Sequence, residues 1–169
     1  DLLAYHFSRA EERTKAIEYV LKAGDKAAQA YANREACTLY EQAVGLLPED
    51  HLARRADVLK KLATVTQYLG DADASLRHAE SAVELYEKLA DKRNAVAMHL
   101  HIQMLYGQQW DGAREDMSLK HLEAAAALVE SDPDSMEKGL VYQRTGHMYL
   151  HRSQPTTTLA WAQRAVDMF

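Results

Sequence analysis

The sequence contains few of the residues that interrupt helices or cross-link chains. Among 169 residues there are seven glycines, three prolines and one cysteine. Such a composition favours long helices over many short strands, and no stretch alternates convincingly at period two. Cys37 has no second cysteine to pair with, which predicts a reducing, cytoplasmic compartment. Since no apolar run approaches the roughly 20 residues that span a bilayer, we expect no membrane partner.

Charge and glycine spacing exclude further classes of partner. A formal net charge of −5 leaves no basic stripe for phosphates, so we expect no nucleic-acid partner. Isolated glycines cannot form the closely spaced loop that cradles a nucleotide, so we expect no cofactor and no catalysis. The chain begins at Asp1 without Met and ends inside a helical pattern at Phe169. We therefore interpret residues 1–169 as a single all-α domain from a larger multidomain protein.

Capping residues and helix breakers define the expected elements. Asn33, Asp71 and Ser135 have the short polar side chains that cap helix N-termini, whereas Gly70 suits a helix C-terminus. We expect a short helix at 2–7 and a turn at 10–13, after which Thr14 caps a long helix that ends at about Tyr31. The next helices are expected from Asn33 to Leu47, from Asp50 to Gly70, from Asp71 through Tyr86, from Asp91 to Gly107 and from Ser118 to Asp132. Two further helices are expected to begin at Ser135 and near Pro155. Residues 108–117 are predicted to be irregular.

Small residues recur at fixed spacing along these helices. Gly24, Ala63 and Gly146 each precede by twelve residues a triplet spaced four and then three apart on the next helix. The triplets are Ala36-Tyr40-Ala43, Ser75-Ala79-Ala82 and Thr158-Ala162-Ala165, in which every residue but Tyr40 is small. Close helix crossings need small side chains where the helices touch. The spacing predicts four to five helical hairpins of roughly 34 residues, stacked as a right-handed α–α superhelix. The positions expected to carry the packing are Gly24, Ala36, Ala43, Ala63, Ala79, Ala82, Gly146, Ala162 and Ala165.

This pattern resembles the tetratricopeptide repeat, whose small residues lie at equivalent positions. The best match is Gly24, Ala36, Tyr40, Ala43 and Pro48, although the signature tryptophan is missing from every unit. The phrases LAYHFSRA, KAIEYVLKAGDKAAQAYANREA and LYEQAVGLLP are similar to the start of the repeat region in bacterial adenylate/guanylate cyclase-type or LuxR-type regulators. That resemblance implies an AAA-type or STAND-type ATPase upstream and a regulatory, signalling role for this arm.

By the same repeat pattern, the first helix of each hairpin lines an inner groove. A mixed polar groove suits a peptide or a helix better than a transition state. We therefore expect a protein–protein interaction scaffold, whose partners are other proteins or other domains of the same polypeptide; a peptide receptor and a groove that binds nothing are the alternatives. The candidate groove residues are Lys60, Thr64, Gln67, His101, Met104, Gln143, Arg144, His147 and His151. If His101 and His147 are neighbours, binding would change between pH 5 and 7.

Three features permit both a functional and a structural interpretation. Trp110, in the irregular stretch, is a possible partner anchor or folds back over its own hairpin. His147 and His151 share a helix face and could hold a metal, although exposed or capping histidines are commoner. Cys37 is interpreted as a buried structural thiol rather than a nucleophile, because its helical surroundings are apolar. We expect no metal site.

Overall fold

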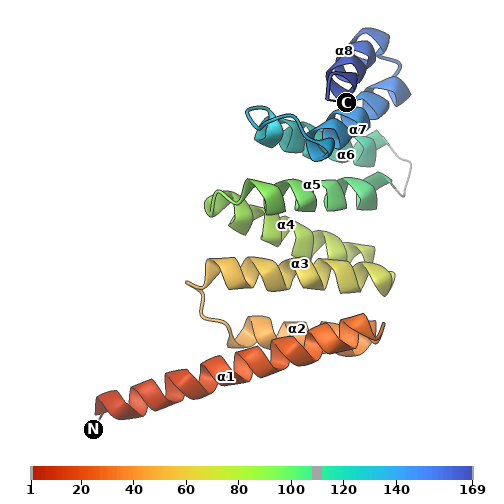
Figure 1. The fold of residues 1–169 in the computed structure, drawn as a ribbon. Helices are drawn as coiled ribbons and strands as arrows, with labels where there is room; N and C mark the ends of the chain where they lie inside the picture. Colours follow the sequence, from red (N-terminus) through yellow and green to blue (C-terminus); the bar gives the residue numbers. More distant parts are fainter. Residues whose placement is uncertain (1, 108–111, 169) are drawn as a thin grey trace. The chain divides into compact units, whose positions relative to one another are not determined.

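The structure, a computed structural model, describes residues 2–107 and 112–168. These residues form eight α-helices and no strand, which confirms the all-α prediction. Figure 1 shows the helices in chain order. They are α1 (Leu2–Gln29), α2 (Asn33–Leu46), α3 (Leu52–Tyr68), α4 (Ala72–Lys88), α5 (Lys92–Gly107), α6 (Gly112–Val129), α7 (Met136–His151) and α8 (Pro155–Val166).

The chain divides into two compact units, residues 1–85 and 86–169, with the boundary inside α4. In unit 1, α1 packs on α2 and α2 on α3 (Figure 1). In unit 2, α5 packs on α6, α6 on α7, and α7 on α8. Each unit has its own apolar core, centred on Tyr40 and Leu62 in unit 1 and on Tyr142 and Leu122 in unit 2. Burying one face of every helix between neighbours stabilises the hairpins, which are too small to be stable alone.

The helices of a hairpin meet at the predicted small residues. A Cβ on Gly24 would lie 2.7 Å from Cε1 of Tyr40, and one on Gly146 would lie 3.2 Å from Cβ of Trp161. In the hairpin of α3 and α4, Ser75 donates a 2.7 Å hydrogen bond to the carbonyl oxygen of Ala63. Glycine or alanine at these positions lets the two backbones approach closely.

Most of the predicted packing positions are buried, and one is not. Ala36, Ala43, Ala63, Ala79 and Ala82 are fully buried, and Gly24, Gly146 and Ala165 are also buried. Ala162 is exposed, contrary to the expectation from the repeat pattern. Its backbone nitrogen lies 3.6 Å from the position of a Cβ on Gly146, so the helix contact itself is present.

The same turn ends four of the helices. Tyr31, Gly70, Ala90 and Ser153 have φ between +55° and +80°, in the left-handed region that favours glycine. In each turn this residue's N–H and the next residue's N–H donate back to the preceding helix, as in the pair Gly70 to the Gln67 carbonyl and Asp71 to the Thr66 carbonyl. The shared geometry explains why the four connections are short and alike. Glycine occupies only one of these four positions.

Three predicted helix starts are confirmed by side-chain caps. Asp71 and Asp91 accept from the backbone N–H groups of Ala74 and Asn94, and Ser135 accepts from that of Lys138. The prediction for Asn33 is wrong, because Ala32 is the N-cap of α2 and no side chain caps it. Likewise α3 begins at Leu52, two residues after the predicted start at Asp50.

The predicted turn at residues 10–13 is wrong, because α1 continues from Leu2 to Gln29. The segment AEERTK has no Gly or Pro to interrupt a helix, and Lys15 pairs with Glu11 one turn earlier at 2.7 Å. Thr14 therefore lies inside a helix and does not cap one. A threonine does not start a helix where the residues before it are good helix formers.

The irregular stretch predicted at 108–117 is wrong for residues 112–117, which begin α6. Ser118, predicted to cap a helix, lies inside α6, where it is buried and its hydroxyl points to Sδ of Met148 at 3.9 Å. Trp110 lies outside the described residues. In the part of the chain that the structure describes, no helix is both long enough and apolar enough to cross a membrane.

Candidate functional site

Unit 2 contains a surface hollow of about 540 Å³ between α5 and α7. Helix α5 contributes Gln103, Met104 and Gly107, and α7 contributes Leu140, Gln143, Arg144, His147 and Met148. The α7 residues follow the spacing of one helix face, at steps of three and four. The buried residues Val141, Tyr142 and Thr145 lie between them in the sequence and hold α7 in the core.

Arg144 is the only charged side chain among the lining residues when histidine is neutral. Its guanidinium donates to Oε1 of Gln103 at 3.3 Å, a neutral acceptor, and no carboxylate of the described residues pairs with it. A guanidinium has five N–H donors, so most remain available for an incoming group. Within the described ranges, the hollow therefore carries a positive charge that no carboxylate compensates.

Apolar surface surrounds this charge. Met104 and Leu140 are each 37% exposed, although both side chains are large and hydrophobic. Met148 is buried at the base of the hollow. Methionine adapts its shape to different apolar groups, because its side chain is unbranched and polarisable. The arrangement can bind a carboxylate and an apolar side chain next to each other.

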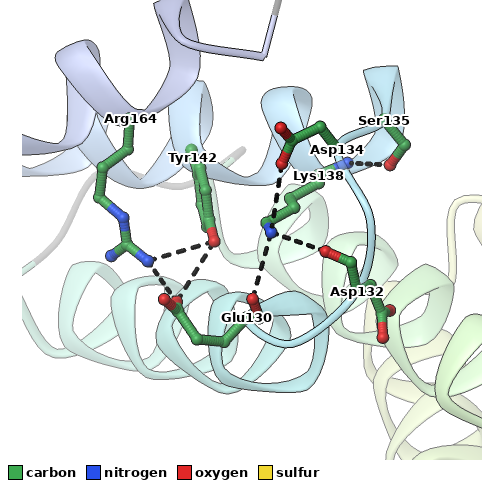
Figure 2. Close-up of polar contacts among 7 residues, drawn as sticks. All are labelled: Glu130, Asp132, Asp134, Ser135, Lys138, Tyr142 and Arg164. Atoms are coloured by element: carbon green, nitrogen blue, oxygen red, sulfur yellow. Dashed lines mark hydrogen bonds and ion pairs between the residues drawn. The ribbon is translucent and has the colours of Figure 1, made fainter.

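A polar network on another part of α7 fixes its position (Figure 2). The hydroxyl of Tyr142 donates to Oε2 of Glu130 at 3.2 Å and accepts from Nη2 of Arg164 at 3.1 Å. Arg164 also pairs directly with Glu130, and its guanidinium stacks over the rings of Tyr142 and Trp161. The Arg164 hydrogen bond holds the pKa of Glu130 below its usual value. The network joins the end of α6, α7 and α8.

Lys138 provides a second link between α6 and α7. Although it is a lysine, it is only 7% exposed. Its ammonium donates to the backbone oxygens of Glu130 at 3.1 Å and Asp132 at 2.8 Å, and lies 3.6 Å from Oδ1 of Asp134 (Figure 2). Carbonyl groups at a helix C-terminus lack intrahelical partners, and a cation there is stabilising. The turn before α7 is thereby held on α6.

The structure brings four of the predicted groove residues into the hollow: Met104, Gln143, Arg144 and His147. Gln103, Gly107, Leu140 and Met148 were missed. Leu140 and Met148 lie one helical turn on either side of Arg144, so helical spacing alone could have identified them. Whether these residues bind a partner stays a prediction.

The other predicted groove residues lie elsewhere. Lys60 and Thr64 line a second hollow of about 370 Å³ in unit 1, with Tyr40 and Lys61. Gln67, His101 and His151 line neither hollow. Burial lowers the pKa of His101, so it titrates below the usual range for histidine. The predicted pH dependence through His101 and His147 stays a prediction.

The histidines do not form a recognisable metal centre in the described part of the chain. His147 and His151 are exposed on α7, with ring centroids 4.5 Å apart and the rings edge to face. Among the described residues, no three His, Cys, Asp or Glu side chains are grouped so as to hold a metal ion. Not all histidines of the chain are exposed, because His99 on α5 is only 4% exposed.

Cys37 is half-buried in α2, not buried as expected. Its thiol points to Oε1 of Glu41 at 3.8 Å. Burial, together with the negative charge of Glu41, raises the pKa of the thiol. Because the thiolate is the nucleophilic form, these surroundings oppose the nucleophile interpretation.

With the geometry described, the chain can be compared with known proteins. No family model and no curated protein matches it. Among solved structures, BtubC (BKLC) from P. vanneervenii superposes with a TM-score of 0.71 at 14% identity, over 90% of this chain and 62% of that one. The TPR-like repeats of a Podosopora anserina protein give a TM-score of 0.67 at 16% identity, over 90% of this chain and 74% of that one. The chain has a tetratricopeptide-like fold.

A third structure with this fold is aspartyl phosphate phosphatase F from Bacillus subtilis. It superposes with a TM-score of 0.71 at 15% identity, over 98% of this chain and 44% of that one. The chain thus spans less than two thirds of the length of BtubC and of the phosphatase. At such identities the likeness concerns the tetratricopeptide-like fold alone, and the function must be argued from the site.

Proposed function

We propose that this chain is a non-catalytic docking module that binds a protein or peptide segment in the hollow of unit 2. The uncompensated charge of Arg144 is the observation that carries this proposal. A buried or half-buried guanidinium without an anionic partner favours binding of a carboxylate, through short charge-assisted hydrogen bonds. The apolar side chains of Met104 and Leu140 beside it favour an adjacent apolar residue. The partner segment then has an acidic residue next to an aliphatic or aromatic one.

We further propose that the module is the regulatory arm of a cytoplasmic, bacterial, ATPase-linked signalling regulator. The amino-acid sequence between Leu3 and Pro48 supports this context, because it resembles the start of the repeat region in such proteins. In that setting the bound segment belongs to another domain of the same polypeptide or to a separate protein. Binding would then shift the equilibrium of the attached output domain. A phosphate-binding loop encoded upstream in the complete gene is the expected finding, and a full-length protein without one contradicts this context.

A peptide array tests the docking role. The purified chain is incubated with immobilised peptides that vary in acidic and apolar content. We expect selective capture of peptides with a carboxylate next to an apolar residue, and loss of capture when Gln143→Ala and His147→Ala are combined. The control is the pair Lys60→Ala and Thr64→Ala in unit 1, which should leave capture unchanged. Equal loss in both pairs, or turnover of a substrate by the purified chain, would contradict the proposal.

A further inference from the structure

Two histidines form a partly buried polar contact between α5 and α6 in unit 2. Nδ1 of His99 lies 2.9 Å from Nδ1 of His121. On its other side, Nε2 of His99 lies 3.2 Å from Oε1 of Glu87, at the end of α4. The ring of Tyr106 stacks against that of His121 at a centroid distance of 6.2 Å. Nothing in the proposed docking role uses this contact.

The hydrogen-bond partners of the two histidines determine which ring nitrogens carry protons. A carboxylate accepts hydrogen bonds, so Nε2 of His99 carries a proton and donates it to Glu87. In the neutral ring, Nδ1 of His99 is then unprotonated and accepts from Nδ1–H of His121. The pair therefore shares a single proton between its two Nδ1 atoms. If both rings were fully protonated, two N–H groups would face each other at 2.9 Å, which is repulsive.

We propose that the His99–His121 contact is an acid-sensitive latch between α5 and α6, which opens when both imidazoles are protonated. A first added proton binds Nε2 of His121 while the shared proton moves to Nδ1 of His99, which then donates to Nδ1 of His121. The hydrogen bond is kept, and the positive charge lies on His99, where it faces the carboxylate of Glu87. The second proton must go to His121, whose partners among the described residues are His99 and the ring of Tyr106 rather than a carboxylate. Breaking this partly buried hydrogen bond removes a polar contact between the two helices and leaves two charged rings near apolar side chains.

The surroundings of the pair support this order of events. Burial, with smaller effects from the charges of His99 and Lys120, lowers the pKa of His121 to about 4. Burial also lowers the pKa of His99, although Glu87 acts in the opposite direction. On the other side of α6, Glu123 is bonded to the hydroxyl of Tyr149 from α7. Among the residues that the structure describes, the charged groups that face the pair are thus Glu87 from α4 and Lys120 on α6 itself.

The lowered pKa values of the two histidines determine whether acid stabilises or destabilises the contact between α5 and α6. A histidine whose pKa is lower when folded is neutral in the folded state and binds a proton on unfolding. Stability of the α5–α6 contact is therefore complete above the unfolded pKa of 6.5 and falls as the pH decreases toward 4. For His121 alone, linkage predicts that local opening of α5 and α6 increases on the order of tenfold between pH 7 and pH 5.

The latch also bears on the docking site, and this consequence rests on the proposed function. Helix α5 carries Gln103 and Met104 of the hollow, less than two turns from His99. Loosening α5 would displace these side chains from Arg144 on α7. Acidification would then weaken binding through the shape of the hollow.

Hydrogen exchange measures the latch without any partner, so its failure is distinguishable from failure of the docking proposal. Protection factors, corrected for intrinsic rates, are compared at pH 7 and pH 5. We expect protection of α5 and α6 to fall about tenfold, and His121→Gln to remove most of this fall. The matched control is His151→Gln, an exposed histidine at the end of α7, which should retain it. Unchanged protection, or the same response in both variants, would overturn the latch.

A second measurement covers the case in which His121→Gln does not fold. Nitrogen-15 NMR of the imidazoles in the unmodified chain can detect the coupling across the hydrogen bond between the two Nδ1 atoms. We expect this coupling at pH 7 and its loss as His121 titrates, together with the fall in protection. A coupling that persists while α5 and α6 lose protection would overturn the proposal.

Discussion

The hollows of the two units differ in how their charges are compensated. In unit 1 the hollow is lined by Lys60, Lys61 and Asp57, and Lys61 pairs with Asp25. In unit 2 the hollow contains Arg144, whose partner is the neutral amide of Gln103. An incoming carboxylate would compete with an existing ion pair in unit 1, whereas in unit 2 it would meet an unpaired cation.

The reason lies in the position of a similar network in each unit. In unit 1 the hydroxyl of Tyr40 donates to Asp25 at 2.8 Å, and Lys61 pairs with the same carboxylate beside the hollow. In unit 2 the corresponding groups are Tyr142, Glu130 and Arg164, which contact one another (Figure 2). None of the three lines the hollow. Unit 1 therefore uses a cation of its hollow to hold its helices together. Unit 2 places the network elsewhere, which leaves Arg144 available.

Overpacking the helix crossings should have the largest effect on stability. In Gly146→Leu, a side chain must fit where a Cβ already lies 3.2 Å from Trp161, and we expect a loss of about 1–3 kcal/mol or more in the unfolding free energy. Denaturant titration followed by tryptophan fluorescence measures this loss, because both tryptophans are in unit 2. A variant as stable as the unmodified chain would contradict the close crossing.

Gly24→Ala is the equivalent change in unit 1. Its Cβ would lie 2.7 Å from the ring of Tyr40, which is buried and held by Asp25 and so cannot easily move. We expect a loss of about 1–3 kcal/mol, although alanine is the better helix former. Hydrogen exchange should show loss of protection in α1 and α2. Gly45→Ala is the control, because no atom lies within 4 Å of its added Cβ; a loss of the same size there would refute the steric explanation.

Asp25→Asn should leave the hollow of unit 1 with a cation that lacks a carboxylate partner, as in the hollow of unit 2. Burial acts to raise the pKa of Asp25, but the hydrogen bonds from Lys61 and Tyr40 and the charge of Lys61 outweigh it and lower the pKa. The carboxylate thus stabilises unit 1 above its unfolded pKa of 3.8, and this stabilisation disappears as the pH falls through the lower folded value. The variant should lose about 1 kcal/mol at pH 7 and lack this acid dependence.

The asparagine variant also frees the charge of Lys61. We expect weak new binding of acidic peptides at unit 1, measured by chemical-shift changes of α3 amides. Tyr40→Phe, which removes the hydroxyl but keeps the Asp25–Lys61 pair, is the control and should show no new binding. Binding in both variants would mean that charge compensation does not distinguish the hollows.

Replacing non-glycine residues in the left-handed turns should have the smallest effect, and it should be stabilising. Tyr31 in unit 1 and Ser153 in unit 2 have φ of 58° and 55°. Tyr31→Gly and Ser153→Gly each relieve this backbone strain, and we expect a gain of about 1 kcal/mol. Thermal unfolding measures the gain. Gly70→Ala, at the equivalent turn with φ of 80°, should lose a similar amount. A gain from Gly70→Ala would show that the turn does not require this conformation.

The sequence predicted the features that depend on local spacing. Gly70, Asp71 and Ser135 marked helix ends correctly, and the small residues marked the crossings. The repeat pattern also placed Arg144 and Met104 on one groove. Thr14 and Ser118 misled the prediction, because the same residue types cap helices or lie within them, depending on their tertiary contacts.

Contacts between residues far apart in the chain were not predictable in this way. The pairing of His99 with His121, and of Lys138 with the carbonyls of Glu130 and Asp132, depends on how neighbouring helices are rotated. A buried lysine or histidine has no periodic signature in a single sequence. The proposed function depends on the charge balance of the two hollows, and this balance can be seen only in the structure.

Titration with one peptide captured on the array tests the central claim most directly. Isothermal calorimetry would compare the unmodified chain with Arg144→Gln and with Lys60→Gln, which remove one positive charge from the hollow of unit 2 and of unit 1. We predict at least about tenfold weaker binding for Arg144→Gln, since a charge-assisted hydrogen bond contributes about 1.5–3 kcal/mol. For Lys60→Gln we predict unchanged binding. Equal weakening in the two variants would mean that net charge alone drives binding, and would contradict a specific site at Arg144.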